Sequence, residues 1–600
     1  MKHSLTLIAF TYLLAISEAA KVTFNVIAPG GADVQVAING QNTKLNAKDA
    51  DVPFFSGEAD IPDDGKYKYV VGGVAEDFDR AAPKGRTSTL NDFFQRPVTY
   101  ANIPELPWPI KENPQWTRGG NPTPLFDSNY IPSVFITGDK AQLDGLITKP
   151  VKDDFNVKFT LVDAQSVQTF NNVKFGIHGA GKSKNNAKQS WRWQLTGNDN
   201  LYNRNYFKLR HMEEDPTQMR EKLYADVLKA MGSYANEANM VRLFINNEFM
   251  GTFNLLDDVK EYSYINARFY NGKPPAEKGP LYDGASGASF LYSPAGDYFS
   301  FKQTEGGPIG GVALLDPICK LFNQTNYADD ASIGKFAEQF DVDQFLRFMV
   351  MEYLAGHWDG YWQMQTNDGA YQDPTDKKWY YLGQDFDATF GVNIPDVDYR
   401  GFVKVSYKDF PQRYPGAILI NNLLKNEKIK QTFETYIKDT VSVLFNNVTL
   451  TNRILAYHDF ILPDLKWDRS VKQRSPGIDF QWTFDQVTEN LYKPVDAPNM
   501  VVIDKMNSTG GAAWGLIEWI AAKSQAVAEE FKITITDKPV FPPKNSSLID
   551  QNGNNNNNNK NNNAGSPGNA DNSNTKDKSG ASMVAPSAVL LVTLAALTLM

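Results

Sequence analysis

The sequence predicts an α+β protein that begins with a small all-β domain and carries a disordered, Asn-rich spacer near its C-terminus. Apolar and polar residues alternate over 22–26 and 34–38, and Asn39-Gly40 and Asp64-Gly65 are typical of hairpin turns. We therefore expect a small β-sandwich within residues 20–110, which also hold the start of a linker. Such a domain could serve as a binding module or as a structural cap.

A larger domain of mixed strands and helices is expected over residues 111–540. After a Pro-rich segment, strand patterns occupy 133–136, 156–161, 173–178 and 189–195. A helix is expected over 216–231, because Asp215 can cap it, proline suits its first position and Gly232 ends it. Further strands are expected at 240–245, 251–256 and 379–382, and helices before Ala355 and throughout 417–532.

Both ends of the chain carry targeting patterns. Residues 1–19 combine a short polar start, an apolar run and small residues before the expected cut, as in a signal peptide. Residues 541–580 are polar and rich in Asn, which predicts the disordered spacer. The apolar tail, residues 581–600, completes the pattern of a glycolipid (GPI) anchor signal, so we expect a cell-surface protein that meets the membrane only through lipid. A tail-anchored helix is the alternative.

The composition narrows the classes of function. A net charge of -9 argues against nucleic acid as the main partner. Hydrophobic residues make up 42% of the chain, which is enough for a sizeable core. Cys319 is the only cysteine, so no intrachain disulfide can form. Four Asn-x-Ser/Thr triplets fit a secreted route and are candidate glycosylation sites: Asn323, Asn447, Asn507 and Asn545.

The segment from Gly176 to Ser183 matches the G-x-x-x-x-G-K-S pattern of a phosphate-binding loop. That loop needs a strand ending at the first Gly and a helix starting at the Lys. Here Gly176 lies within a strand pattern and another strand pattern follows Ser183, so we discount a P-loop. Two strands joined by a glycine-rich turn are instead the arrangement of a kinase glycine-rich loop, whose backbone N–H groups could hold phosphates.

Two further groups of residues fit the same chemistry. A kinase-type site needs a strand Lys on the nucleotide phosphates, held by a helix Glu, and Lys188 and Glu221 occupy such positions. A surface Lys and a solvated Glu would look the same from spacing alone.

Acidic loop residues form the stronger group. Asp359 follows a helix and could accept the proton of a hydroxyl, while Asn367, Asp385 and Asp387 offer oxygen ligands to a hard cation such as Mg²⁺ or Mn²⁺. The order of these residues resembles the catalytic and metal loops of kinases. Loop acids that cap helices and turns are the alternative reading.

Together these residues resemble the CotH family, named for a bacterial spore-coat component and similar to atypical protein kinases. The resemblance covers about residues 117–531. It rests on Ser183 with the segment 188–191, on 220–223, on 241–251, on Trp358-Asp359, on Asn367 and on 384–391. The two end signals are similar to those of the fungal, surface-displayed branch, whose members resemble invasins that contact host-cell receptors.

The resemblance implies an atypical protein-kinase-like fold and a role for each matched residue. Lys188, with Ser183, would hold the phosphates of ATP, and Glu221 would pair with Lys188. Asp359 would be the catalytic acid, and three residues would share the metal: Asn367, Asp385 and Asp387. Bacterial members commonly have an aromatic residue where this chain has Gln384, a departure that leaves the acids intact.

Two functions remain open at this stage. One is an ATP-dependent protein kinase acting on protein hydroxyls, and the other is a surface adhesin or invasin with a catalytically silent scaffold. For receptor contact the best segment is 364–379, which is rich in Gly, Asp and Tyr and lies beside the acids. Its candidate receptor-binding residues are Asp368, Tyr371 and Asp373, and a plain solvated hairpin is the alternative.

Overall fold

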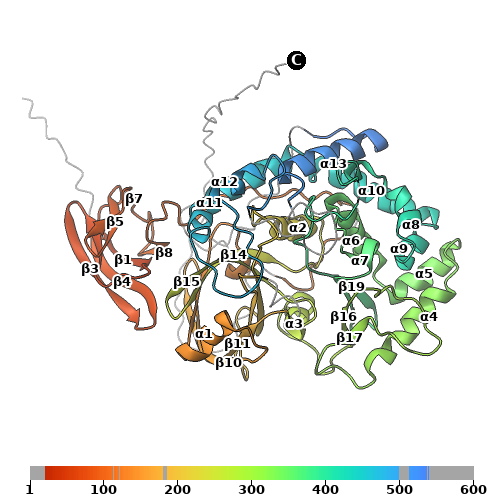
Figure 1. Ribbon diagram of the computed structural model, residues 1–600, viewed down its shortest axis with the longest axis horizontal. Helices are drawn as coiled ribbons and strands as arrows, with labels where there is room; N and C mark the ends of the chain where they lie inside the picture. Colours follow the sequence, from red (N-terminus) through yellow and green to blue (C-terminus); the bar gives the residue numbers. More distant parts are fainter. Residues whose placement is uncertain are drawn as a thin grey trace, which may run out of the picture. The chain divides into compact units, whose positions relative to one another are not determined.

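The computed structural model describes residues 20–111, 114–120, 122–179, 186–396, 398–498, 512–536 and 538 (Figure 1). The expected signal peptide, spacer and apolar tail lie outside these residues, as do Ser183, Asn507 and Asn545. The described part is α+β, all-β at its start and mainly helical at its end, as the sequence predicts. It contains no helix that is long and apolar enough to cross a membrane.

The N-terminal domain is a single eight-stranded sheet with the order β6-β5-β2-β3-β4-β1-β8, and β7 pairs with β5. Its strands are β1 (Ala20–Ile27), β2 (Val34–Ile38), β3 (Gln41–Asp49), β4 (Val52–Ile61), β5 (Lys66–Val71), β6 (Val74–Ala75), β7 (Arg80–Ala81) and β8 (Ser88–Phe93). The first half of β3 pairs with β2 and its second half with β4, so this one strand joins two halves of the sheet. Both halves contribute to one core that includes Phe24, Val36 and Tyr69, which gives the sandwich-like packing that the alternation predicts.

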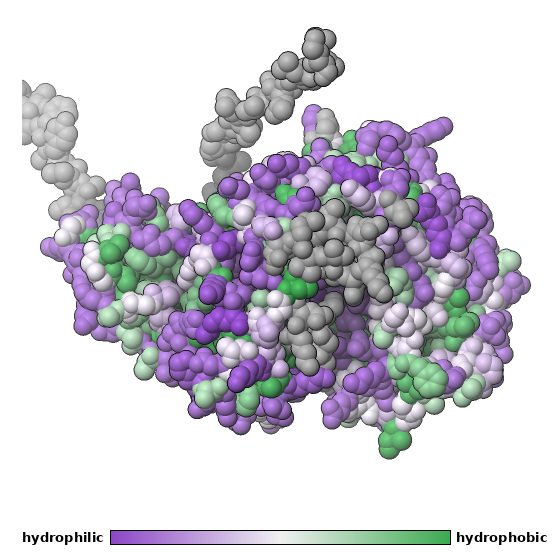
Figure 2. All heavy atoms as spheres, viewed as in Figure 1, coloured by the Kyte–Doolittle hydropathy of each residue, from purple (hydrophilic) through white to green (hydrophobic). Residues whose placement is uncertain are grey.

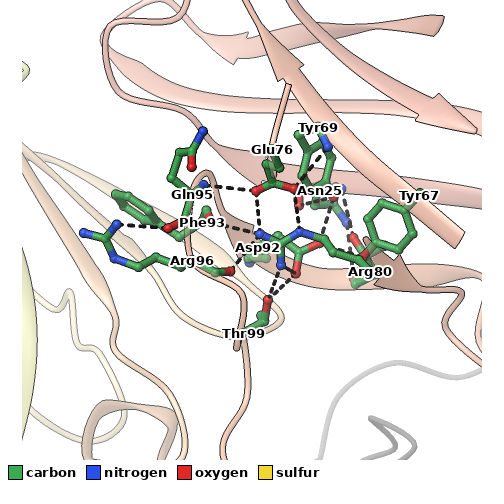
Figure 3. A network of polar contacts seen from close by, with 12 residues as sticks. Asn25, Tyr67, Tyr69, Glu76, Arg80, Asp92, Phe93, Gln95, Arg96 and Thr99 are labelled. Carbon is green, nitrogen blue, oxygen red and sulfur yellow. Dashed lines mark hydrogen bonds and ion pairs between the residues drawn. The ribbon is translucent and has the colours of Figure 1, made fainter. Parts of the chain in front are cut away.

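A buried network of polar groups links the strands of this domain to the segment that follows β8 (Figure 3). The guanidinium of Arg80 donates to both carboxylate oxygens of Glu76, at 2.7 and 3.0 Å, and pairs with Asp92 at 3.3 Å. Asp92 also accepts hydrogen bonds from the hydroxyls of Tyr67 and Tyr69, at 2.9 and 2.8 Å. Arg80 reaches the backbone carbonyls of Phe93 and Arg96 as well, so the network holds the segment that leaves the domain.

The second part of the chain begins with a closed barrel of seven strands, ordered β10-β11-β12-β13-β15-β14-β9. Its elements are β9 (Ser133–Thr137), α1 (Lys140–Thr148), β10 (Phe155–Val162), β11 (Val167–Ile177), β12 (Trp191–Gln194), β13 (Tyr206–Arg210), α2 (Arg220–Ala230), β14 (Ala238–Ile245) and β15 (Glu248–Leu256). Stacked rings of Phe159, Trp193 and Phe207 fill its interior. The expected strands are therefore confirmed, and their pairing closes them into the barrel.

An apolar contact joins the N-terminal domain to the barrel. Phe54 and Phe93 belong to the same buried cluster as Phe135 and Phe244 of the barrel. Arg96 continues the junction, because its guanidinium pairs with Asp464 of α11 at 3.0 Å. These contacts favour the structural cap over a freely moving binding module.

A four-stranded antiparallel sheet and a set of helices complete the fold (Figure 1). The sheet has the order β17-β16-β18-β19, with β16 (Leu281–Gly284), β17 (Phe301–Gln303), β18 (Asp368–Gln372) and β19 (Trp379–Gly383). The helices are α3 (Tyr262–Tyr270), α4 (Asp316–Gln324), α5 (Asp330–Gln339), α6 (Val342–Ala355), α7 (Tyr361–Met364), α8 (Phe410–Arg413), α9 (Ile418–Leu423), α10 (Glu427–Val443), α11 (Thr449–Asp468), α12 (Phe484–Glu489) and α13 (Leu516–Phe531). Short 3₁₀ helices lie at Pro124–Phe126, Gly311–Leu315, Phe402–Lys404 and Tyr407–Asp409.

The surface seen in Figure 2 is mainly hydrophilic, with small apolar patches of which the clearest lies at the lower right, below β17. Side chains such as Phe299 and Ile309, in the segment that flanks β17, are almost fully exposed. Single exposed apolar side chains of this kind are ordinary on a protein surface, and these two are the most exposed of the large apolar ones among the described residues.

Two helices position the residues that the sequence analysis singled out. The helix expected over 216–231 begins later, as α2 (Arg220–Ala230), so the predicted cap at Asp215 with Pro216 as the first helical residue is wrong, and Met219 occupies the N-cap position. The carboxylate of Asp215 instead accepts hydrogen bonds from the backbone N–H groups of Met219 and Arg220 from the turn that precedes the helix. The predicted stripe of this helix is buried and places Glu221 toward the barrel. At the end of α6, Gly356 has a φ of 63°, and a Cβ there would meet Trp519 at 2.5 Å. Only glycine fits this turn, which directs the following residues toward Asp359.

Candidate active site

A cleft of about 500 Å³ lies between the barrel and the second sheet. Basic side chains line it from the barrel side: Lys208, Arg210 and, beyond β15, Lys260. From the sheet side it is lined by Asp283, Asn367, Gln384 and Asp385. Positive charge therefore faces acidic and amide groups across one opening, which is an arrangement suited to phosphates and hard cations.

Asp359 contacts Asn367, which lines the cleft, although Asp359 itself is not one of the lining residues. The amide nitrogen of Asn367 donates to the backbone carbonyl and to Oδ2 of Asp359, both at 2.9 Å. On the other side, Nε2 of His357 lies 3.4 Å from Oδ1 of Asp359. Burial raises the pKa of the Asp359 carboxyl, and the nearby acids Asp385 and Asp387 raise it further. Asp359 is thus held in a fixed orientation and is more basic than an ordinary Asp, which suits a proton acceptor.

Asp385 and Asp387 share one counter-ion, Arg210. The guanidinium of Arg210 lies 2.9 Å from Oδ1 of Asp385 and also bonds Oδ2 of Asp387. Between the two acids, Phe386 stacks on Tyr224 of α2 with ring centroids 4.2 Å apart. The stacked ring fixes the loop, so both acids face Arg210, and Asp385 also lines the cleft, whereas Asp387 is buried behind it.

Glu221 adjoins the same charges from α2. Its Oε2 accepts from the side-chain amide of Asn254 at 3.1 Å, and its carboxyl is fully buried. Burial raises the pKa of Glu221 to about 7, an effect that Arg210 opposes and Asp387 reinforces. A strongly shifted carboxyl beside a cleft is typical of a functional site.

Lys188 does not form the expected pair with Glu221. Its Nζ instead lies 2.7 Å from Oδ1 of Asp468 at the end of α11, and its side chain is 1% exposed. Gly251 makes room for this pair, because a Cβ there would meet both Asp468 and Lys188. Lys188 is therefore paired with the end of α11, and the positive charge that acts most strongly on Glu221 is that of Arg210.

The basic side chains of β13 were not among the residues predicted from the sequence. Lys208 and Arg210 lie two residues apart on one strand, so both point to the same face. That alternation, followed by α2 with Glu221 in its first turn, could have been read as a charged strand beside the cleft.

A second missed pair is His178 and Asp258. Nε2 of His178 lies 3.0 Å from Oδ2 of Asp258 at the cleft wall. Burial lowers the pKa of His178 to about 4, so the neutral ring donates this hydrogen bond at physiological pH.

Oxygen ligands for a cation are present, although they are few. Two carboxylates, Asp385 and Asp387, and the amide oxygen of Asn367 are donors that Mg²⁺ and Mn²⁺ accept. Within the described residues, no group of three or more His, Cys, Asp or Glu side chains is placed to hold a metal. The donor chemistry fits a metal that shares its coordination with phosphate oxygens, as Mg²⁺ does at nucleotide sites.

The receptor-binding residues expected in segment 364–379 are not on the surface. Asp368 and Asp373 are 0% exposed and Tyr371 is 1% exposed. The reason is that β18 and β19 form a hairpin inside the second sheet, where Asp373 pairs with Arg118 and bonds Tyr270. The exposed residues of this segment are Met364 and the turn of the hairpin at Thr375, Asp376 and Lys377.

Two of the candidate glycosylation sites can be placed. Asn323 and Asn447 both have exposed side chains, Asn323 on α4 and Asn447 just before α11. Cys319 is fully buried, which fits its expected role as a core residue.

Comparison with known proteins decides the family. Residues 175–496 match the family described as "CotH kinase protein". The chain belongs to the CotH family. It is 58% identical to "Invasin CotH3" of Rhizopus delemar over 543 residues, which cover 90% of this chain and 89% of that protein. It is 53% identical to "Invasin CotH2" of the same fungus over 600 residues, 98% of each chain, and 52% identical to its "Spore coat protein homolog 1" over 527 residues, 87% of this chain and 84% of that protein. The resemblance to the fungal invasin branch of the CotH family is thus confirmed.

Proposed function

We propose that this CotH protein transfers the γ-phosphoryl group of ATP to hydroxyl groups of other proteins, with Mg²⁺ or Mn²⁺ at the cleft. The observation that carries the proposal is that Lys208, Arg210 and Lys260 meet the acids of the second sheet in one cleft of about 500 Å³. Phosphoryl transfer asks a protein mainly for positioning and for neutralisation of phosphate charge. The description of the matched family, which includes the word kinase, supports the same reading and a kinase-like fold.

Each side chain has a role in this proposal. Lys208 and Lys260 hold the phosphate oxygens, while Asp385, Asp387 and Asn367 supply oxygen ligands to the metal. The bound metal neutralises charge on the phosphates. Asp359 is oriented by Asn367 and His357 and accepts the proton of the attacking hydroxyl group. The oxygen of that hydroxyl group then forms a bond to the γ-phosphorus, and the bond between the γ-phosphorus and the oxygen of ADP breaks. Glu221 keeps Arg210 and the acids in place from α2.

The experiment is calorimetry of the full chain with ATP and Mn²⁺, followed by transfer from γ-labelled ATP to a generic acceptor protein. We expect metal-dependent binding and labelled acceptor. Absence of metal-dependent ATP binding would rule out the kinase function and leave the alternative of a surface adhesin with a catalytically silent scaffold.

A role as an invasin is the second proposal, and it is compatible with the first. Its support is the names of the relatives, two of which are called invasins at 58% and 53% identity. We propose that the protein is carried to the cell surface, held there by a glycolipid anchor, and contacts host-cell receptors through the exposed hairpin turn at Thr375–Lys377. A glycolipid-specific phospholipase should release it from membranes, and the released protein should lack residues 581–600. Retention on the membrane with the tail peptide intact would rule out the anchor.

A further inference from the structure

A second cavity borders the segment that carries Asp359. It has a volume of about 340 Å³ and shares no lining residue with the cleft. Trp358, Gln363 and Met364 line it, whereas Thr366 and Asn367 of the same segment line the cleft. The stretch from 358 to 367 therefore separates two cavities of different chemistry.

The walls of this cavity are largely apolar and are held in place by their neighbours. Phe402 is 3% exposed and stacks on Phe410, and Tyr414 packs edge-on against the same ring at 5.1 Å. The indole N–H of Trp358 donates to the carbonyl of Val392 at 3.1 Å, which fixes the third aromatic wall. Because these groups are already ordered, a ligand would lose little free energy in organising the cavity.

The charges of this cavity are balanced. Arg413 and Asp396 both line it, and they pair with each other at 3.1 Å. The main cleft, by contrast, is lined by three basic side chains and by acids that pair with two of them, Arg210 with Asp385 and Lys260 with Asp283. An uncharged, apolar group therefore suits the smaller cavity, and the charged phosphates suit the larger one.

The smaller cavity is also within reach of the transfer chemistry. Trp358 precedes Asp359 directly, so their Cα atoms are about 3.8 Å apart. An extended peptide advances about 3.3–3.6 Å per residue, so a side chain within about three residues of an acceptor hydroxyl at Asp359 can enter the cavity.

We infer that this cavity binds an aromatic or large aliphatic side chain of the acceptor polypeptide, close in sequence to the hydroxyl that receives the phosphoryl group. The inference rests on the proposed kinase function and adds its substrate class: proteins with an apolar residue beside the acceptor Ser, Thr or Tyr. Apolar burial of one such side chain favours its peptide about 10- to 100-fold over one with Gly or Asp at that position.

The test uses the full chain and an array of short peptides with one central acceptor, in which each flanking position carries Phe, Leu, Gly, Asp or Lys in turn. A parallel array carries Ala at the acceptor position and reports binding alone. Gln363→Trp fills the cavity from its wall, and Met364→Trp fills it from its exposed mouth, where a change in folding is least expected. Gln431→Trp, on the exposed face of α10, is the matched control.

In the wild type and the control we expect a preference for Phe or Leu at one flanking position of about tenfold or more, and both cavity-filling variants should lose it. Metal-dependent ATP binding should be the same in all four proteins. A flat preference in the wild type, or a preference that survives both variants, would overturn the inference.

The two proposals fail in different ways. If ATP does not bind and no label is transferred, the kinase proposal fails, and the array with Ala at the acceptor position still decides whether the cavity binds apolar peptides. If the cavity-filling variants lose ATP affinity instead of peptide preference, the cavity belongs to the nucleotide and the peptide inference is wrong.

Discussion

Two buried arginines, Arg80 in the N-terminal domain and Arg210 at the cleft, each lie between two carboxylates, but their surroundings differ. Around Arg80, tyrosine and threonine hydroxyls and backbone N–H groups fill the remaining positions on Glu76 and Asp92 (Figure 3). Around Arg210, a third acid, Glu221, adjoins the pair with its pKa raised to about 7, and a cleft opens beside them.

The difference separates a structural network from a functional one. A network with every polar group satisfied rigidifies the fold, and no ligand is needed to complete it. An excess of acid beside an opening leaves room for a cation and its phosphates. A buried ion pair alone therefore indicates neither role. The role depends on whether the neighbouring polar groups already have hydrogen-bond partners and on whether there is space for a ligand beside them.

The substitution Asp359→Asn gives the strongest test of whether the acids near Arg210 are functional and those near Arg80 structural. This change keeps the size of the side chain and its contact with Asn367 but removes the proton acceptor. We expect transfer from ATP to fall by about 10²- to 10⁴-fold, while ATP affinity stays nearly unchanged. Asp376→Asn, in the exposed hairpin turn, serves as the control. Full transfer by the Asp359 variant in a labelled-ATP assay would show that the acids at the cleft are structural, like those around Arg80.

The two arginines can be compared directly by changing each to methionine. Arg80→Met leaves Glu76 and Asp92 buried without their counter-ion, which should lower the free energy of unfolding by about 3–5 kcal/mol. Arg210→Met should also destabilise the protein, but Mn²⁺ with ATP should restore the loss, because these acids can then hold a metal.

Denaturant unfolding of both variants, with and without Mn²⁺ and ATP, measures this difference. Rescue of the Arg80 variant by the metal, or no rescue of the Arg210 variant, would contradict the distinction between the two networks.

The pH dependence of stability tests whether His178, in the wall of the cleft, is held neutral by burial. Burial lowers the pKa of His178 to about 4, whereas an unfolded His titrates near 6.5. The unfolded state thus takes up the proton first as the pH falls, and the stability held above about pH 6.5 is lost between about pH 6.5 and 4. At 1.36 kcal/mol per pKa unit, the loss amounts to about 3 kcal/mol.

His178→Gln keeps a donor to Asp258 and removes the titration. The variant should therefore lose less stability than the wild type between pH 7 and 4 when unfolding is followed in urea. Parallel curves for the two proteins would mean that the ring of His178 is not held neutral by burial.

Regular elements were predictable from the sequence because their patterns are local. The alternation in β1 and β2 and the buried stripe of α2 depend on neighbouring residues only. The acids Asp359, Asp385 and Asp387 were predictable for a similar reason, since each lies within four residues of the end of a buried helix or strand.

Pairing across the fold was not predictable in the same way. Lys188 meets Asp468, 280 residues later, through space left by Gly251, and no local pattern records that contact. Burial of segment 364–379 was missed for a related reason: Gly, Asp and Tyr look polar, but Tyr371 pairs with Tyr380 across a hairpin that the rest of the sheet covers. The closed barrel likewise depends on the pairing of β9 with β14, which lies about a hundred residues further on.

The smallest expected effect on stability concerns the exposed turn of that hairpin. Lys377 is exposed, and among the residues that the structure describes its side chain forms no hydrogen bond or ion pair. Lys377→Glu should therefore change the free energy of unfolding by no more than about 0.5 kcal/mol. If host receptors contact this turn, the charge reversal should still lower attachment of protein-coated beads to host cells severalfold, because opposed charges at an interface cost affinity and association rate. Lys472→Glu, exposed elsewhere on the chain, makes the same change in net charge and should leave attachment unaltered. Equal attachment by both variants would move the receptor-binding surface away from the hairpin, whereas equal loss would show that attachment follows net charge and no particular site.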